Sequence, residues 1–251
     1  MIEAFFFGPC GQQIFATYHP PLGGNGQVLT VICPPFFNEY MRTHLALREL
    51  AISLAERGQH VLRFDYRGTG DSFGELREVS LVDWQEDITL AVREGREISG
   101  SSRVYLLGVR AASLLACSAV DLSSDVQRVV LWDPVLDGSS YLQSLRDIQM
   151  VIADRQLWLS RAERRRVKHE YAGYVLSEAM EKQLVSFDAS AYLSVPDGLL
   201  RVVSSSTTSF PIQRVPHTVA LFNCEWNTAA EELILARPVL ERLVECLTNP
   251  S

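Results

Sequence analysis

The chain has 251 residues, of which 47% are hydrophobic and 21% charged, with a formal net charge of −7 at pH 7. This size and composition favour one domain with a large core, and the acidic balance disfavours a nucleic-acid partner, which needs a basic surface. The five cysteines are odd in number, widely spaced and without a CxxC pair, which argues against a disulfide framework and a zinc site. We expect no metal site and no cofactor.

No apolar run approaches the roughly 18 residues that a membrane span needs. The stretch Phe5-Phe6-Phe7 is too short for the apolar core of a signal peptide, and no basic segment precedes it. The expected location is therefore the cytoplasm, without a membrane span.

Strands and helices alternate along most of the chain. Two apolar stretches flank Gly8-Pro9-Cys10-Gly11 and predict an antiparallel N-terminal hairpin. After it come predicted strands at 28–33, 61–64, 104–107, 129–132, 199–203 and 218–222, and predicted helices at 45–56, 84–98, 111–120 and 229–247. Strand, crossover helix and strand in this order imply parallel pairing, so we expect a mostly parallel, doubly wound α/β sheet.

One segment interrupts this alternation. Residues 138–196 contain no strong strand pattern, whereas 141–153, 161–171 and 177–187 have helical patterns. We therefore predict a core of residues 1–137 and 197–251 with a helical cap inserted at 138–196. Ligands of doubly wound folds bind at the carboxyl edge of the sheet, where this cap would lie.

The sequence Gly108-Val109-Arg110-Ala111-Ala112 joins a predicted strand to a predicted helix. A strand, sharp turn and helix of this kind forms the nucleophile elbow of serine hydrolases, but the central position here is arginine. Such enzymes also need an acid after a late strand and a histidine after the last strand. The segments there, Ser204-Ser205-Ser206-Thr207-Thr208-Ser209 and Asn223-Cys224-Glu225-Trp226-Asn227, contain no acid and no histidine in those roles.

Several residues remain as catalytic candidates: Arg110, Asp133, Glu39 and His44. Asp133 follows a strand directly, where some enzymes of this architecture place their acid, and Glu39 and His44 follow the Pro34-Pro35 break. The elbow and the loop of a possible oxyanion hole give the candidate ligand-binding residues Arg110, Phe36, Phe37, Val109 and Ala111. His217 begins the last predicted strand, at its amino end, and we expect it on the far side of the sheet.

Four segments carry a family resemblance: 33–44, 62–72, 108–110 and 131–138. Together they resemble bacterial α/β-hydrolase-like proteins related to the serine aminopeptidase superfamily and to exosortase-system-associated hydrolases. The resemblance covers most of residues 1–200. It implies the α/β-hydrolase fold, and it implies that an arginine at the elbow is a trait of the group.

Arginine at a helix N-terminus favours an anion, because the unpaired N–H groups, the helix dipole and the guanidinium fork all attract negative charge. The first hypothesis is a catalytically divergent protein that binds an acidic or acyl-type small molecule between core and cap. In the alternative for Arg110, it pairs internally with Asp133, Glu39 or Asp65 and fills a dead site.

Two further hypotheses stay open. One is a hydrolase or acyl transferase on ester, thioester or amide bonds with a non-standard nucleophile or an activated water. The other is a non-enzymatic partner in a biosynthetic or export assembly. A homodimer is also left open.

Overall fold

The computed structural model describes residues 1–23, 26–120, 125–155, 160, 170–207, 210–229 and 232–249. Its described strands form one eight-stranded sheet in the order β1-β2-β4-β3-β5-β6-β7-β8. The strands are β1 Glu3–Phe7, β2 Ile14–His19, β3 Val28–Cys33, β4 His60–Phe64, β5 Arg103–Val109, β6 Val126–Trp132, β7 Leu200–Ser204 and β8 His217–Val219. β1 pairs antiparallel with β2, and β2 antiparallel with β4, whereas all other neighbours are parallel. The predicted hairpin and doubly wound sheet are confirmed.

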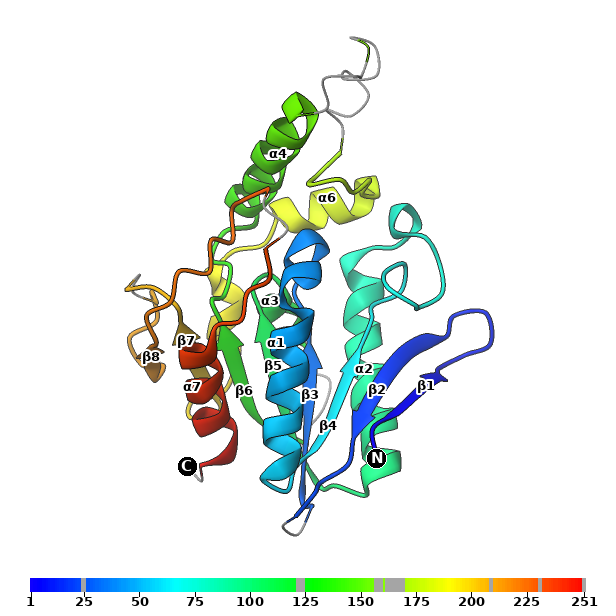
Figure 1. The fold of residues 1–251 in the computed structure, drawn as a ribbon, viewed down its shortest axis with the longest axis vertical. Coiled ribbons are helices and arrows are strands. Elements are labelled where there is room, and N and C mark those ends of the chain that lie inside the picture. Colours follow the sequence, from blue (N-terminus) through cyan, green and yellow to red (C-terminus); the bar gives the residue numbers. More distant parts are fainter. Residues whose placement is uncertain are drawn as a thin grey trace.

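Helices cover both faces of this sheet. They are α1 Phe37–Glu56, α2 Leu81–Ser99, α3 Ala112–Ser118, α4 Gly138–Arg155, α6 Glu178–Val185 and α7 Arg237–Thr248, with 3₁₀ turns at Leu76–Glu78 and Ala189–Leu193. The buried side chains of α1 and α7 pack on one face, and those of α2 and α3 on the other. α4 and α6 lie at the top of the molecule in Figure 1, beyond the carboxyl ends of the parallel strands. None of the helices in the described residues is long and apolar enough to cross a bilayer.

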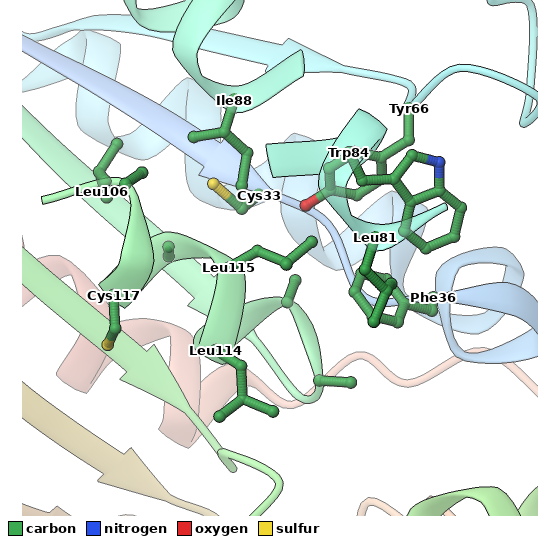
Figure 2. Close-up of a cluster of buried hydrophobic side chains, with 14 of the residues drawn as sticks. Cys33, Phe36, Tyr66, Leu81, Trp84, Ile88, Leu106, Leu114, Leu115 and Cys117 are labelled. Atoms are coloured by element: carbon green, nitrogen blue, oxygen red, sulfur yellow. The ribbon is translucent and has the colours of Figure 1, made fainter. Parts of the chain in front are cut away.

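An aromatic cluster fills the core beneath α2 (Figure 2). The rings of Tyr66 and Trp84 stack with centroids 4.8 Å apart, and Phe36 lies 4.7 Å from Trp84. All three side chains are at most 2% exposed. Because the turn after β4, α2 and the segment after β3 each contribute one ring, this cluster fixes the start of α1 against the sheet.

The first helix begins eight residues before its predicted start. The prediction placed it at 45–56, but α1 spans Phe37–Glu56. Its first turns bury two charged side chains, Glu39 and Arg42, so hydrophobic periodicity does not reveal them. A buried acid and a buried base near one sheet edge indicate a polar site there.

The C-terminal region differs from its prediction in a similar way. The closing helix, predicted at 229–247, is α7 Arg237–Thr248, with Pro238 in its first turn. Proline is tolerated only at a helix start, which explains the later beginning. The strand predicted at 218–222 is the three-residue β8. Of the predicted cap helix at 161–171, residues 161–169 lie outside the described residues, and Tyr171 lies in a turn that pairs with Tyr174.

The segment from α4 to Ala189–Leu193 is attached to the core by side chains. Tyr192 donates from its hydroxyl to the Val135 carbonyl at 2.6 Å, and Ser177 donates to the Val79 carbonyl at 2.6 Å. Gln183 accepts from the Leu81 backbone N–H at 2.7 Å. These bonds tie the segment to the ends of β6 and α2.

Candidate functional site

Arg110 lies in the turn between β5 and α3, with a φ of 56°. Gly108 permits this turn, because a Cβ there would lie 2.6 Å from the Ser113 Cα. Positive φ also occurs at Phe37, Asp133 and Glu225, none of which is glycine. Each is, or lies within two positions of, a residue that contacts Arg110. Strained backbone of this kind is common at functional sites. Here the strained residues follow β5 and β6 and begin α1.

The Arg110 guanidinium is held on three sides. Its Nε donates to the Glu39 Oε1 at 2.9 Å, and its Nη1 donates to the Asp133 backbone carbonyl at 3.0 Å. Its Cζ lies 4.9 Å from the centroid of the Trp226 ring, a cation–π contact. Among the described residues, no partner accepts from Nη2. The side chain is 14% exposed and lines a cavity of about 270 Å³.

Glu39 is a buried carboxylate that accepts hydrogen bonds from two side chains. Besides Arg110, the Tyr141 hydroxyl of α4 donates to its Oε2 at 3.1 Å. Burial raises the pKa of Glu39, while the charge of Arg110, these two hydrogen bonds and Arg42 oppose that rise. Burial lowers the pKa of Arg110, but the Glu39 carboxylate reverses this, so the net shift of the guanidinium pKa is upward.

Asp133 has a separate set of partners. Its Oδ1 accepts from the Ser205 backbone N–H at 2.7 Å, and its Oδ2 accepts from the Ser205 hydroxyl at 2.6 Å and from the Trp226 Nε1 at 2.8 Å. The expected internal pairing of Arg110 is thus observed with the Glu39 carboxylate. With Asp133 it uses only the backbone carbonyl. Asp65 takes no part, since it accepts from Tyr40 and from the Asp71 backbone.

The loop that carries Trp226 is fixed by Arg42 of α1. Arg42 donates to the Glu225 carbonyl at 2.9 Å and to the Glu232 carbonyl at 3.1 Å. A buried cation with several carbonyl partners orders irregular backbone. Arg42 therefore holds the indole over Arg110, a role that the sequence did not reveal.

The cavity beside Arg110 lies at the carboxyl ends of β5, β6, β7 and β8. Its lining residues are Arg110, Asp133, Pro134, Leu136, Ser204, Ser205, Ser206, Phe210, Phe222, Asn223, Cys224, Glu225 and Trp226. No described residue of the 138–196 segment lines it. Burial raises the pKa of Cys224 to about 12, so the thiol stays protonated at neutral pH and is not a nucleophile.

The other expected site residues lie elsewhere. Phe36 and Phe37 line a second, apolar cavity of about 220 Å³ together with Tyr174 of the inserted segment. Val109 and Ala111 are fully buried in the core. His44 is exposed on α1, where its Nδ1 lies 2.7 Å from the Met41 carbonyl oxygen. No group of three or more metal-ligating side chains occurs within the described ranges.

His217 is the residue that the sequence analysis placed wrongly. It does begin β8, but β8 is staggered, so that its first residue pairs with Val202. The imidazole Nε2 consequently lies 2.8 Å from the Ser204 Oγ at the end of β7. A histidine at the amino end of a short edge strand thus contacts Ser204, a residue that lines the cavity at the carboxyl end of the neighbouring strand.

Comparison with known proteins places the chain in a family. Residues 37–189 match the family model of the serine aminopeptidases, S33. The chain belongs to this family. The matched range extends from the start of α1 to the 3₁₀ turn after α6, and so includes Glu39, Arg110 and Asp133. No curated protein sequence matches the chain.

Solved structures with the same fold include several hydrolases. Est1E from Butyrivibrio proteoclasticus, with ferulic acid bound, has a TM-score of 0.62 and 14% identity, covering 98% of this S33-family chain and 100% of Est1E. A thioesterase domain from the curacin biosynthetic pathway has a TM-score of 0.58 and 14% identity over 99% and 100% of the two chains. A hypothetical protein from Pseudomonas aeruginosa has a TM-score of 0.59 and 15% identity over 88% and 85%. The chain thus has the α/β-hydrolase fold.

Proposed function

We propose that this S33-family protein binds a small carboxylate or acyl compound in the cavity beside Arg110, and that Arg110 acts as an anchor and not as a nucleophile. The observation that carries the proposal is that the Arg110 guanidinium is fixed in place by its neighbours. Glu39, the Asp133 carbonyl and Trp226 fix it, while Nη2 remains without a described partner beside a cavity of about 270 Å³. A pre-oriented donor edge costs little reorganisation when an oxygen ligand arrives.

Three positions of the fold support this assignment. Arg110 stands in the elbow turn, Asp133 follows β6, and Trp226 follows the last strand. In a serine hydrolase these positions hold the nucleophile, an acid and the histidine. Here the guanidinium stacks on the indole, and the indole N–H donates to the acid, so the three side chains form a connected set without a nucleophile at the elbow.

The location of the cavity refines the expected ligand site. The sequence predicts a ligand between core and cap, whereas the loops after β5, β6, β7 and β8 line the cavity. We propose that the 138–196 segment acts at a distance, through the Tyr141 hydroxyl on Glu39. Est1E binds ferulic acid, which is a carboxylic acid, so this fold accommodates a ligand of the proposed class.

Calorimetric titration with hexanoate tests the proposal, with hexanol as the uncharged control ligand. Wild type should bind hexanoate and not hexanol. Arg110→Lys should bind more weakly, because an ammonium lacks the fork geometry, and Arg110→Ala should lose about 2–5 kcal/mol of affinity. Arg242→Ala, which removes an exposed arginine of α7, should bind as wild type does.

Two results would contradict the proposal. One is equal binding of hexanoate by wild type and Arg110→Ala. The other is that wild type binds none of the straight-chain carboxylates from acetate to octanoate, hexanoate included.

A further inference from the structure

The cavity beside Arg110 contains a serine hydroxyl in contact with an imidazole. The Ser204 Oγ lies 2.8 Å from the His217 Nε2, within the distance at which a base can take a proton from a nucleophile. Ser204 lines the cavity, whereas His217 is not among the lining residues and is partly exposed. A nucleophile that lines the cavity is thus paired with a base outside the lining.

Two adjacent strands fix this pair. β7 and β8 are parallel, with Val202 opposite His217 and Ser204 opposite Val219. His217 and Ser204 are therefore diagonal neighbours on one face of the sheet, close enough for side chains to meet. The Phe210 ring packs 6.4 Å from the imidazole and also lines the cavity. Because both residues stand on sheet backbone, their contact is set before any ligand binds.

The neighbouring serine has a different task. The Ser205 hydroxyl donates to the Asp133 carboxylate at 2.6 Å, so its proton is engaged with an acceptor that orders the Trp226 loop. The Ser113 hydroxyl is fully buried in α3 and donates to the Gly108 carbonyl at 3.0 Å. Ser204, in contrast, combines access to the cavity with a base.

We infer that Ser204 and His217 form a nucleophile and base pair that cleaves a small carboxylic ester in the cavity. The Ser204 Oγ attacks the ester carbonyl carbon while its proton passes to the His217 Nε2. The developing oxyanion lies in the cavity that the Arg110 guanidinium lines, and a fixed cation there stabilises it. Collapse breaks the bond to the alcohol, which leaves with the proton from Nε2.

Water completes the cycle. Nε2 takes a proton from water as its oxygen attacks the acyl-Ser204 carbonyl, and the proton returns to the Ser204 Oγ as the acid departs. The net reaction is ester plus water to carboxylic acid plus alcohol. The acid product is the class of ligand assigned to Arg110, so this part of the inference rests on the proposed function.

A fluorophosphonate probe with a reporter group tests the pair on the intact chain. Peptide mapping by mass spectrometry should find one adduct, on Ser204, and none at residue 110, where arginine offers no hydroxyl. Ser204→Ala should abolish the adduct, and His217→Gln should slow labelling at least about a hundredfold, the usual contribution of a general base. Hydrolysis of p-nitrophenyl hexanoate should fall in parallel.

Matched controls separate chemistry from folding. Ser113→Ala removes a buried hydroxyl in α3, and His44→Gln removes an exposed imidazole on α1; both should be labelled at the wild-type rate. Thermal unfolding of each variant establishes that it is folded. The inference is overturned if wild type is not labelled, if the adduct lies on another serine, or if folded His217→Gln reacts as fast as wild type.

The labelling and the titration can fail separately. Labelling at Ser204 without hexanoate binding would retain the pair and remove the carboxylate anchor. Hexanoate binding without labelling would retain the carboxylate anchor and remove the Ser204–His217 pair.

Discussion

Two largely buried arginines follow parallel strands that lie on either side of β3, and they differ in what surrounds them. Arg67 follows β4 and is 11% exposed, whereas Arg110 follows β5 and is 14% exposed. The Arg67 side chain contacts three acids of α2, with its Nε on the Asp87 Oδ1 at 2.5 Å and its Nη2 on the Glu86 Oε2 at 3.1 Å. The Arg110 side chain has one carboxylate, one carbonyl and one indole.

The difference separates a structural cation from a site cation. One helix supplies all the acids around Arg67, and the Arg67 backbone N–H also donates to the Asp87 Oδ2 at 2.8 Å. Its guanidinium locks the turn after β4 to α2. Arg110 is held by groups from α1, the turn after β6 and the loop after β8, and it lines a cavity. An arginine whose acidic partners all come from one helix has a structural role. An arginine that several elements hold beside a cavity is a candidate for ligand binding.

The largest expected effect is on folding at Arg67. Arg67→Ala leaves the fully buried Asp87 without its cation and should lower the free energy of unfolding by about 3–5 kcal/mol. Urea unfolding at pH 7 measures this. Arg242→Ala, which breaks an exposed pair on α7, is the control and should change stability by less than about 1 kcal/mol. Equal effects of the two variants would remove the structural role of Arg67.

The acids of both regions should make stability depend on pH in the same direction. Burial raises the pKa of Asp87 from 3.8 to about 6, although its hydrogen bond from the Arg67 backbone and the charge of Arg67 oppose this. The native state therefore holds the proton more tightly than the unfolded state. The resulting stability is complete below about pH 4 and is lost as pH rises through about 6, by up to about 3 kcal/mol.

Asp87→Asn should lack this loss. The measurement is the free energy of unfolding of wild type minus that of the variant, at intervals from pH 4 to pH 7, and the difference should fall as pH rises. Burial also raises the pKa of Glu39, so Glu39→Gln should show the same sign. A difference that grows with pH in either variant would contradict the burial argument.

Arg110 should matter less for folding than Arg67. Arg110→Met should cost about 1–3 kcal/mol, because Glu39 keeps its hydrogen bond from Tyr141 when the guanidinium is gone. Adding Glu39→Gln should recover at least about 1 kcal/mol of that cost, since the neutral amide needs no cation. Unfolding of the two single variants and the double variant completes the cycle. A cost above that of Arg67→Ala would make Arg110 the stronger structural arginine and reverse the comparison.

The smallest effect concerns the link from α4 to the site. Tyr141→Phe removes the hydroxyl that donates to Glu39 and should cost about 1 kcal/mol. Tyr174→Phe is the matched control, because its hydroxyl has no partner among the residues that the structure describes, and it should be near neutral. If thermal unfolding shows the two variants to be alike, the Tyr141 contact contributes nothing.

Local sequence patterns were sufficient for the sheet and for the turns beside it. Continuous apolar runs predicted the parallel strands, and their alternation with helices predicted a mostly parallel, doubly wound sheet. The turn after β4 also depends on a local requirement. At Gly70, φ is 51°, and a Cβ would lie 2.1 Å from the Asp65 Oδ2, so glycine is required there.

Patterns failed where polar side chains are buried. The first turns of α1 contain Glu39 and Arg42, whose partners lie 71 and more than 180 positions away along the chain. No local periodicity encodes such a pairing. The sequence gives no sign of the role of Trp226, whose indole N–H donates to Asp133 and whose ring covers the Arg110 guanidinium.

The sequence by itself determined the α/β sheet, the arginine at the end of β5 and the unusual residues at the ends of the later strands, because these depend on local composition and order. The tertiary structure decided which acid Arg110 meets, which cavity it lines, and that His217 reaches Ser204. These depend on the stagger of β8 and on the path of the loop after it, which long-range packing fixes. A shift of one residue in a strand moves a side chain to the opposite face, so such contacts emerge only from the assembled sheet.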